Sequence, residues 1–532
     1  MGFLSCRYFW WDIIHNDKHL STVPETEGCQ QRIETRICAL PDDLLLQILD
    51  HVPTKEAVAT SILSKRWRYV WPMLSRLEFK EDGSESVGCF IEKSLQLHKA
   101  PKLDSLIVEL GQHCRVDVDV GKWVENAVNR GVEELDLKLL WTAEPTRLPM
   151  CLYTCDTLVD LTLSNQILVD VSSPACLPSL LNLSLLDVVY QDEDSLVRLL
   201  SSSPILNYLW VRRHEDDNLK TFTVKVSSLE TLFYMTSWRK DEVEEDEVEV
   251  DEEDHDYGSL VIDCPSLTML DLIDVWEDYC LIENMPCLDV ADIGFVPNPD
   301  AKFLRSLSSV TYMHLCLTKS MVACCSAINF SQLIKLYFLP TNLVDWLTPL
   351  MFFLQNSPKL KTLMINNTEA GDLQPSWNQP STIPGCMSTH LEIFGWKDYG
   401  GREDEKQLVT YILANSKCLK TVEISLIATC NLEERQKELR NLLFSRNTAG
   451  SDDSTVANSS GIPDATVVDY SPEAVQARLK EEARNREKGS KRNGKKKQVL
   501  PATVAAELKV KEEKSAAAKK KEHKKKKHYH DF

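Results

Sequence analysis

The sequence predicts an α/β protein with a small helical module first, a long array of repeats next and a disordered basic tail last. Three features of the 532 residues indicate this fold class. Apolar side chains crowd residues 40–71 at helical spacing, one six-residue apolar pattern recurs between residues 103 and 424, and positive charge is concentrated after residue 472. The 43% hydrophobic content is ample for an extended core, although the chain is too long for one compact unit.

The first helix of the module is expected to have Pro41 in its first turn, with Asp42 and Asp43 near its positive end. Its apolar residues share one broad face: Leu44, Leu45, Ile48 and Leu49. The next two helices are expected to begin at Thr54 and Ser64, because both residue types favour the N-cap position. The sequence therefore predicts three short helices before the repeats.

This module holds more apolar surface than a domain of its size can bury internally. Trp67 and Trp71 are four residues apart, so they lie on the same side of the third helix. We expect part of the apolar surface to face a partner protein.

The repeat array consists of an apolar residue, two others, an apolar residue, one other and an apolar residue. Most successive units start 21 to 29 residues apart, which is the leucine-rich-repeat signature. The last three positions predict a short strand, and the first apolar residue is expected to enter the same core from the preceding loop. Stacked units predict a curved solenoid, and an ordinary α/β domain with Leu-rich strands is the alternative. The units start at residues 103, 132, 158, 180, 206, 229, 267, 288, 310, 333, 360, 391 and 419.

An acidic insert, residues 239–257, interrupts the array. Within it, 12 of the 16 residues from 241 to 256 are Asp or Glu, and such a block repels itself and lacks apolar side chains to pack. We interpret the insert as a disordered, solvated loop. A docking strip for a basic partner, or for the basic tail of the chain itself, is the alternative.

Charge and cysteine content complete the description of the chain. The net charge of −20 is unevenly distributed. Residues 473–531 form a basic tail with 20 Lys and Arg and 9 Asp and Glu, and the rest of the chain has 40 basic and 71 acidic residues. The 17 cysteines lack metal-site spacing, and neither a signal peptide nor a membrane span is recognised. We expect a reducing compartment (nucleus, cytoplasm or both), a disordered extension at residues 1–32, and neither metal nor cofactor.

Residues 40–71 resemble an F-box of the large plant F-box/leucine-rich-repeat group, in the start LPDDLL, the turn PTKEAV and the end TSILSKRWR. The resemblance implies that the module, residues 33–78, binds a Skp-family adaptor, which links it to the cullin and RING subunits of a ubiquitin ligase. Packing inside the module is the alternative role for each residue, and Trp71 is the one most easily assigned to the core. The implied adaptor-binding residues are Leu40, Pro41, Leu44, Ile48, Leu49, Val58, Ser61, Leu63, Ser64 and Trp67.

Residues 383–424 resemble the FBD module that follows the repeats in many of these plant proteins. The segment HLEIFGWKDYGG predicts a strand and a Gly-rich turn, EDEKQLVTYILANSKCL a helix, and KTVEI a final strand. Trp396 and Tyr399 are interpreted as packing residues. The helix is expected to bury Leu408, Tyr411, Ile412 and Leu413. The predicted boundaries are residues 100–370 for the repeats and 371–447 for the FBD module.

Residues 448–532 have the composition of a linker followed by a low-complexity basic tail that ends in KKKEHKKKKHYHDF. Such a cluster is typical of nuclear-import and nucleic-acid-binding segments, and a solvated tail without a ligand is the alternative. The tail departs from the resemblance, so the sequence is also compatible with a fusion of two gene models.

The function predicted from these features is that of a substrate-recognition subunit of an SCF-type cullin-RING ubiquitin ligase, with the repeats binding a protein to be ubiquitinated. The alternatives are a nucleic-acid-associated or nuclear scaffold protein that acts through the tail, and an F-box scaffold without a ubiquitination substrate. The sequence contains no GxxxxGK, HExxH or GxSxG motif, so we expect no catalytic residue and no enzymatic activity.

Overall fold

The structure is a computed structural model that describes residues 40–80, 87–111, 118–140, 144–214, 217–237, 258–276, 278–300, 302–324, 328–340, 346–366, 380–427 and 464–467. All of them belong to the first of two units, Met1–Val468, and none to the second, Asp469–Phe532. The predicted extension 1–32 and the acidic insert lie outside the described residues. So do the predicted linker and tail, apart from residues 464–467.

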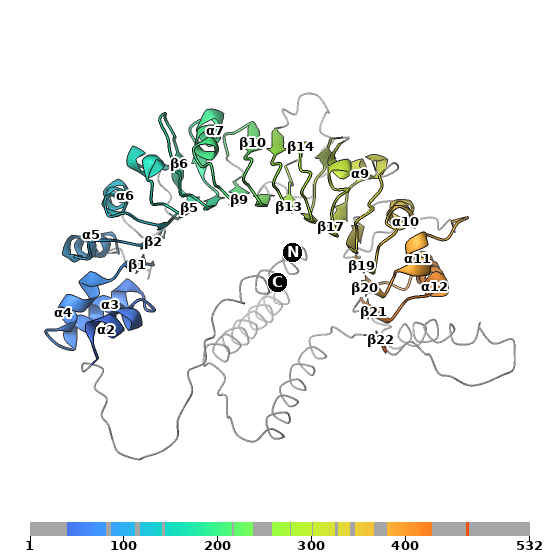
Figure 1. Cartoon of the computed structure of the whole chain (residues 1–532), viewed down its shortest axis with the longest axis horizontal. Coiled ribbons are helices and arrows are strands. Elements are labelled where there is room, and N and C mark those ends of the chain that lie inside the picture. The colour runs from blue at the N-terminus through green and yellow to red at the C-terminus, as the bar shows by residue number, and fades with distance from the viewer. Residues whose placement is uncertain are drawn as a thin grey trace, which may run out of the picture. The chain divides into compact units, whose positions relative to one another are not determined.

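The N-terminal module is helical, as predicted (Figure 1). Its elements are α2 (Asp42–Leu49), α3 (Thr54–Ala59), the 3-10 turn η2 (Thr60–Ile62), α4 (Trp67–Val70) and the 3-10 turn η3 (Trp71–Met73). Pro41 is the N-cap of α2, one residue before the first turn in which it was predicted, and its carbonyl oxygen accepts a hydrogen bond from the backbone nitrogen of Leu45 at 3.2 Å. Both predicted caps are wrong, because Pro53 is the N-cap of α3 and α4 begins at Trp67, beyond Ser64.

The main sheet contains fifteen parallel strands whose order in space follows their order in the chain. Each connection therefore returns the chain to the same edge before the next strand begins, as parallel pairing requires. The strands are β1 (Arg76–Phe79), β2 (Ser105–Leu110), β3 (Glu134–Leu139), β5 (Asp160–Asn165), β7 (Asn182–Leu186), β9 (Tyr208–Arg213), β11 (Thr231–Thr236), β13 (Met269–Ile273), β15 (Val290–Ile293), β17 (Tyr312–Leu317), β18 (Lys335–Pro340), β19 (Thr362–Asn366), β20 (Ile393–Tyr399), β21 (Thr421–Leu426) and β22 (Asp464–Val467).

The strands predicted from the apolar pattern are confirmed. Each begins two residues after the first apolar residue of its unit, as β2 does after Leu103 and β21 after Leu419. These first apolar side chains are buried, so they do enter the core from the preceding loop. Two strands of the main sheet, β1 and β22, were not predicted, although β1 follows the same apolar pattern in residues 74–79.

The connections carry helices and two small parallel sheets on the outer side of the main sheet (Figure 1). One small sheet contains β4 (Thr146–Arg147), β6 (Ile167–Val169) and β8 (Val189–Tyr190), and the other contains β10 (Thr221–Lys225), β12 (Ser259–Asp263), β14 (Tyr279–Asn284) and β16 (Asn298–Pro299). The helices are α5 (Val87–Leu97), α6 (Val120–Val128), the 3-10 helix η4 (Met150–Thr154), α7 (Glu193–Ser201), α8 (Phe303–Ser306), α9 (Lys319–Cys324), α10 (Leu347–Asn356), α11 (Gly385–Thr389) and α12 (Glu403–Asn415).

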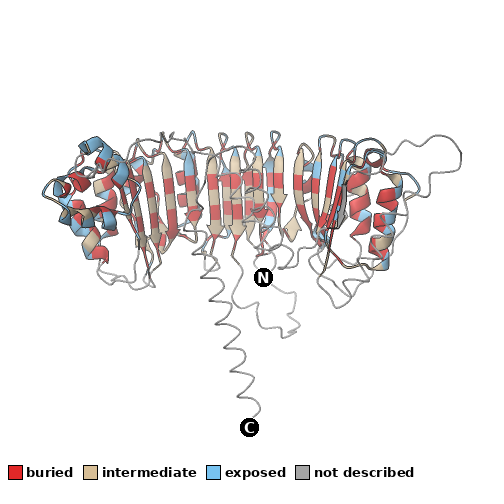
Figure 2. Cartoon of the chain, turned by 90° about the horizontal axis from the view of Figure 1, so that it is seen from below, coloured by how far each residue is buried: buried red, intermediate tan, exposed pale blue. Residues whose placement is uncertain are grey.

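Buried and less buried side chains alternate along the main strands, because successive residues of a strand point to opposite faces (Figure 2). The buried set forms one core that continues from the helical module through the repeats to α12 and β21. Among the described residues, every helix is too short or too polar to cross a lipid bilayer.

The segment that resembles an FBD module folds as predicted, with β20, the Gly400–Gly401 turn, α12 and β21 in succession. The predicted helix face, Leu408, Tyr411, Ile412 and Leu413, is buried. Trp396 and Tyr399 are also buried, and their rings contact each other edge to face at 5.3 Å between centroids. These two aromatic residues therefore pack in the core, as interpreted from the sequence.

Candidate partner-binding surface

The residues predicted to contact an adaptor differ in exposure. Pro41 is exposed, and so are Leu44 at 43%, Ile48 at 40% and Leu63 at 55%. Leu40, Val58, Ser61 and Ser64 are half-buried. Leu49 and Trp67 are buried at 3% and 1% exposure, so their side chains are already covered within this chain. A contact between these two residues and an adaptor stays a prediction.

Four further apolar side chains are exposed on the module, and sequence reasoning missed them. They are Ile62 at 88%, Tyr69 at 69%, Met73 at 42% and Val52 at 36%. Tyr69 had a signal in the sequence, because a residue midway between Trp67 and Trp71 faces away from both on a helix. Ile62 lies beyond α3, which ends at Ala59, and is the last residue of the 3-10 turn η2.

The surface is held in shape by contacts between the helices. Arg66 Nε donates to Asp42 Oδ1 at 2.7 Å, and this ion pair joins the start of α2 to the residue before α4. Both side chains are exposed, so the pair stabilises the fold by only ~0–1 kcal/mol. The packing of α2 against α4 therefore depends mainly on their buried side chains, Leu45, Leu49 and Trp67, which belong to one core.

The module is fastened to the first strands of the main sheet. The Thr54 hydroxyl accepts a hydrogen bond from the backbone nitrogen of Glu78 in β1 at 2.7 Å, and Thr54 is 1% exposed. The backbone nitrogens of Lys99 and Ala100 donate to the carbonyl oxygen of Pro72 at 2.7 and 3.0 Å. Helices and sheet therefore share hydrogen bonds as well as core.

His98 adds a third connection between the module and the repeats. Its Nε2 donates to the Leu74 carbonyl oxygen at 2.7 Å, and its Nδ1 accepts from Arg130 at 2.5 Å. This arrangement needs a neutral ring, and burial, assisted by the Arg130 charge, lowers the pKa of His98 to about 4. His98 is therefore uncharged at neutral pH and links α5, the module and the loop after α6.

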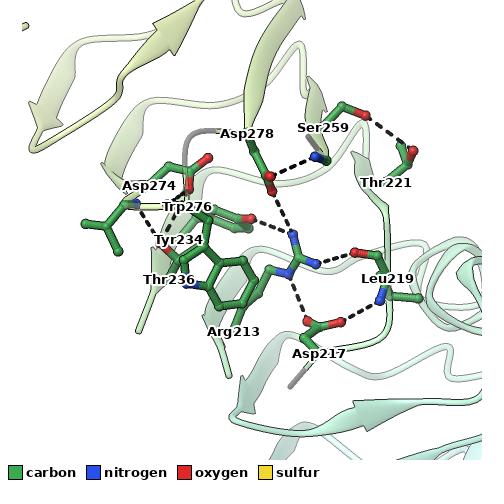
Figure 3. Close-up of polar contacts among 12 residues, drawn as sticks. Arg213, Asp217, Leu219, Thr221, Tyr234, Thr236, Ser259, Asp274, Trp276 and Asp278 are labelled. Carbon is green, nitrogen blue, oxygen red and sulfur yellow. Dashed lines mark hydrogen bonds and ion pairs between the residues drawn. The ribbon is translucent and has the colours of Figure 1, made fainter. Parts of the chain in front are cut away.

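Outside the module, charged side chains are buried around Arg213 at the end of β9 (Figure 3). Its guanidinium donates to Asp217 Oδ2 at 2.8 Å, to the Leu219 carbonyl oxygen at 2.6 Å and to Asp278 Oδ2 at 3.3 Å. The Arg213 side chain is 2% exposed, with the ring of Trp276 4.8 Å away. A buried cation with this many partners is satisfied, so we assign it a structural role.

This cluster also holds both ends of the segment that contains the acidic insert. Trp276 Nε1 donates to the Ser237 carbonyl oxygen at 2.6 Å, and Gly258 N donates to Asp278 Oδ1 at 3.0 Å. Residues 238–257 lie between these two ends. Within the described part of the chain, no group of three His, Cys, Asp or Glu side chains is placed to hold a metal ion.

The fold and surface define a class of protein: a small helical module with exposed apolar side chains, attached to a long parallel repeat sheet. Comparisons with known proteins agree. Family models match residues 37–79 as F-box domain, 120–276 as the LRR repeats of FBD-associated F-box protein At5g56370, and 379–424 as FBD.

Three relatives come from Arabidopsis thaliana. At1g22000, an F-box/FBD/LRR-repeat protein by name, is 72% identical over 440 residues, which cover 82% of this chain and 94% of the relative. At1g05080, an FBD-associated F-box protein by name, is 48% identical over 77% of this chain and 93% of its own length. The F-box/FBD/LRR-repeat protein At5g56420 is 39% identical over 76% of this chain and 95% of its own length. The chain belongs to the plant F-box/FBD/LRR-repeat family.

Proposed function

We propose that the chain is the substrate-recognition subunit of an SCF-type cullin-RING ubiquitin ligase. In this proposal the helical module is a three-helix F-box that binds a Skp-family adaptor, and the main sheet is the inner face of a leucine-rich-repeat solenoid that binds a protein substrate. The protein would act in the nucleus, the cytoplasm or both. It would supply no catalytic residue, because holding a substrate lysine near the ubiquitin carrier is sufficient.

One observation carries the proposal. The module exposes Leu44, Ile48, Ile62 and Leu63 although it is built on a well-formed core. Exposed apolar side chains gathered on one small module indicate a protein–protein interface. The F-box match over the same residues supports an adaptor as the partner.

The test is co-purification of the full chain with a plant Skp-family adaptor. We expect a stable complex, and we expect Leu44→Asp combined with Ile62→Asp to abolish it, since two charges would be buried at the interface. Val197→Asp is the matched control, because Val197 is 45% exposed on α7, outside the module. A folded wild-type chain that forms no adaptor complex would contradict the proposal.

Substrate recognition is tested by a second measurement. In a reconstituted ligase, ubiquitin transfer to a bound protein separates a substrate receptor from an F-box scaffold without a substrate. Steeply salt-dependent RNA or DNA binding that requires residues 472–532 would instead favour the nucleic-acid alternative.

A further inference from the structure

One row of side chains crosses the main sheet on the face opposite to the core. The pairing register places its members side by side on successive strands, and almost all are half-buried, whereas their neighbours along each strand are buried. We call it the central row. From β1 to β21 it comprises Glu78, Ile107, Asp136, Thr162, Ser184, Trp210, Phe233, Asp271, Asp292, His314, Tyr337, Met364, Gly395 and Glu423.

The central row is acidic. It contains five carboxylates, Glu78, Asp136, Asp271, Asp292 and Glu423, and no Lys or Arg. Lys and Arg do occur in the adjacent rows. Arg76 pairs with Glu134 at 2.9 Å and Lys138 with Glu109 at 2.9 Å, whereas Lys335 on β18 is exposed beside Tyr337. On β11, β13, β15 and β17 no outward position is Lys or Arg.

Aromatic side chains lie on both sides of the central acidic pair. Asp271 and Asp292 are register partners on β13 and β15. On one side, the rings of Tyr208 and Phe233 are 5.6 Å apart, with Trp210 next to Phe233 in the row. On the other side, the rings of Tyr312 and Tyr337 are 5.3 Å apart. We call the six consecutive members from Trp210 to Tyr337 the acidic-aromatic patch.

The pKa values of two phenol groups beside the patch are raised, mainly by burial and to a smaller extent by the nearby carboxylates. Burial, followed by the charge of Asp271, raises the pKa of Tyr208 to about 12. Burial, followed by Tyr337 and Asp292, raises the pKa of Tyr312 well above its usual value. The carboxylates of the central row disfavour a new anion on this face and favour a cation.

We propose that the acidic-aromatic patch binds a positively charged, extended segment of a partner protein, with Arg or Lys side chains reaching Asp271 and Asp292. This proposal rests on the proposed function, and it assigns a chemical class to the segment that the subunit recognises. Within the patch, His314 Nδ1 donates to Asp292 Oδ1 at 2.7 Å. A carboxylate accepts several hydrogen bonds, so a guanidinium or ammonium can be bound at Asp271 and Asp292 in addition to the contacts that they already make.

The aromatic residues explain why the partner should be a basic protein segment. Arg and Lys interact favourably with the faces of Trp and Tyr, and Arg also forms paired hydrogen bonds with carboxylates. From β11 to β17 the row crosses three strand spacings, roughly 15 Å, which an extended peptide spans with about five residues. Nucleic acid fits poorly, because its phosphates would meet the carboxylates of the central row.

The experiment measures fluorescence anisotropy of a short fluorescein-labelled peptide in which Arg alternates with Leu and Ser. A control peptide carries citrulline in place of each Arg, which keeps the shape of the side chain and removes its charge. We expect the full chain, in its adaptor complex, to bind the Arg peptide more tightly as salt is lowered, and the citrulline peptide weakly. Asp271→Asn/Asp292→Asn should weaken Arg-peptide binding about tenfold or more.

Asp136→Asn/Asp160→Asn is the matched control, because it removes two carboxylates from the same face on β3 and β5, outside the patch. It should change binding less than about threefold. Equal binding of both peptides, or equal affinity of the patch variant and wild type, would overturn the inference. Since all variants are measured as adaptor complexes, failure of the proposed function would appear earlier, as absence of that complex.

The tail of the chain is the competing occupant. In a further variant, the lysines at 524–527 are replaced by serine in the full chain. Unchanged affinity for the Arg peptide supports a separate partner. A gain of about tenfold would mean that the tail occupies the patch, and it would overturn the assignment to another protein.

Discussion

Asp274 is a buried carboxyl group whose protonation should affect the stability of the repeats around it. It is 0% exposed, its Oδ1 accepts from Trp276 N at 3.1 Å, and its Oδ2 has no hydrogen-bond partner among the described residues. Burial, followed by the charge of Asp278, raises the pKa of Asp274 to about 7. The folded state therefore holds a proton that the unfolded chain releases near pH 4.

The sign of the pH effect follows from this difference. Between about pH 4 and pH 7 the folded state binds more protons at Asp274, so the free energy of unfolding falls as pH rises, by up to ~1.4 kcal/mol per pH unit. We expect Asp274→Asn to remove this slope, which urea denaturation of both proteins from pH 5 to pH 8 would reveal as a pH-dependent difference. His98, neutral in the folded state, contributes the opposite slope below pH 6.5 in both proteins and cancels from the difference. A constant difference would contradict the assignment.

Gly258 is a second residue with a specific spatial requirement. A Cβ at this position would meet Asp278 Oδ1 and the Lys220 carbonyl oxygen, each at 2.7 Å. The backbone oxygen cannot yield without breaking its hydrogen bond from Ser259 N, so we expect Gly258→Ala to cost about 1–3 kcal/mol in a denaturant titration. Gly385→Ala is the control, since nothing lies within 4 Å of a Cβ there, and it should unfold like the wild type.

At the scale of elements, Thr54 connects the helical module to β1. Thr54→Val removes the hydroxyl that accepts from Glu78 N, with little change in volume, and should cost about 1–3 kcal/mol. We expect hydrogen exchange to accelerate in α2, α3 and β1 and to stay unchanged beyond β5. Thr60→Val is the control, because the Thr60 hydroxyl donates only to Ala57 O within the module. Equal exchange in β1 for both variants would show that the module is held by packing alone.

Strands that bury one face could be predicted from the sequence. Helix caps and very short strands, which depend on individual hydrogen bonds, could not. The main strands could be predicted from the spacing of Leu, because apolar residues at every second position are typical of a strand with one buried face. The predicted cap of α3 was wrong, because the Thr54 hydroxyl accepts from a strand distant in sequence instead of from its own helix. The predicted cap of α4 was wrong, because that helix begins only at Trp67. The short outer strands such as β4 and β16 have two residues each and carry no periodicity to detect.

The candidate site shows the same limit. The sequence identified the module correctly as rich in apolar surface, but helical spacing alone could not separate Leu44, which is exposed, from Leu49, which is buried. That difference depends on how α2 packs against α4. The Arg213 cluster was not predicted either, because its members come from three repeats and meet only after folding.

At the scale of the whole described unit, stability should behave as a sum of neighbouring repeats. Leu232 is fully buried in β11, and Leu232→Ala should cost about 2–5 kcal/mol. We expect native-state hydrogen exchange to rise in β9, β11 and β13 and to change little in β2 and β19. A uniform loss of protection from β1 to β21 would instead indicate a single cooperative unit.

Because the main strands follow one another in chain order, the number of strands between two sites sets the distance between them along the sheet. Measured along the sheet, the helical module at β1 and the acid pair on β13 and β15 are separated by seven to eight strand spacings, roughly 35 Å. Each repeat gained or lost between them would move a bound segment by about 5 Å relative to the adaptor. Under the proposed function, family members with different repeat numbers would hold a bound substrate at different distances from the adaptor, and the number of repeats would help to determine which substrate lysines are reached.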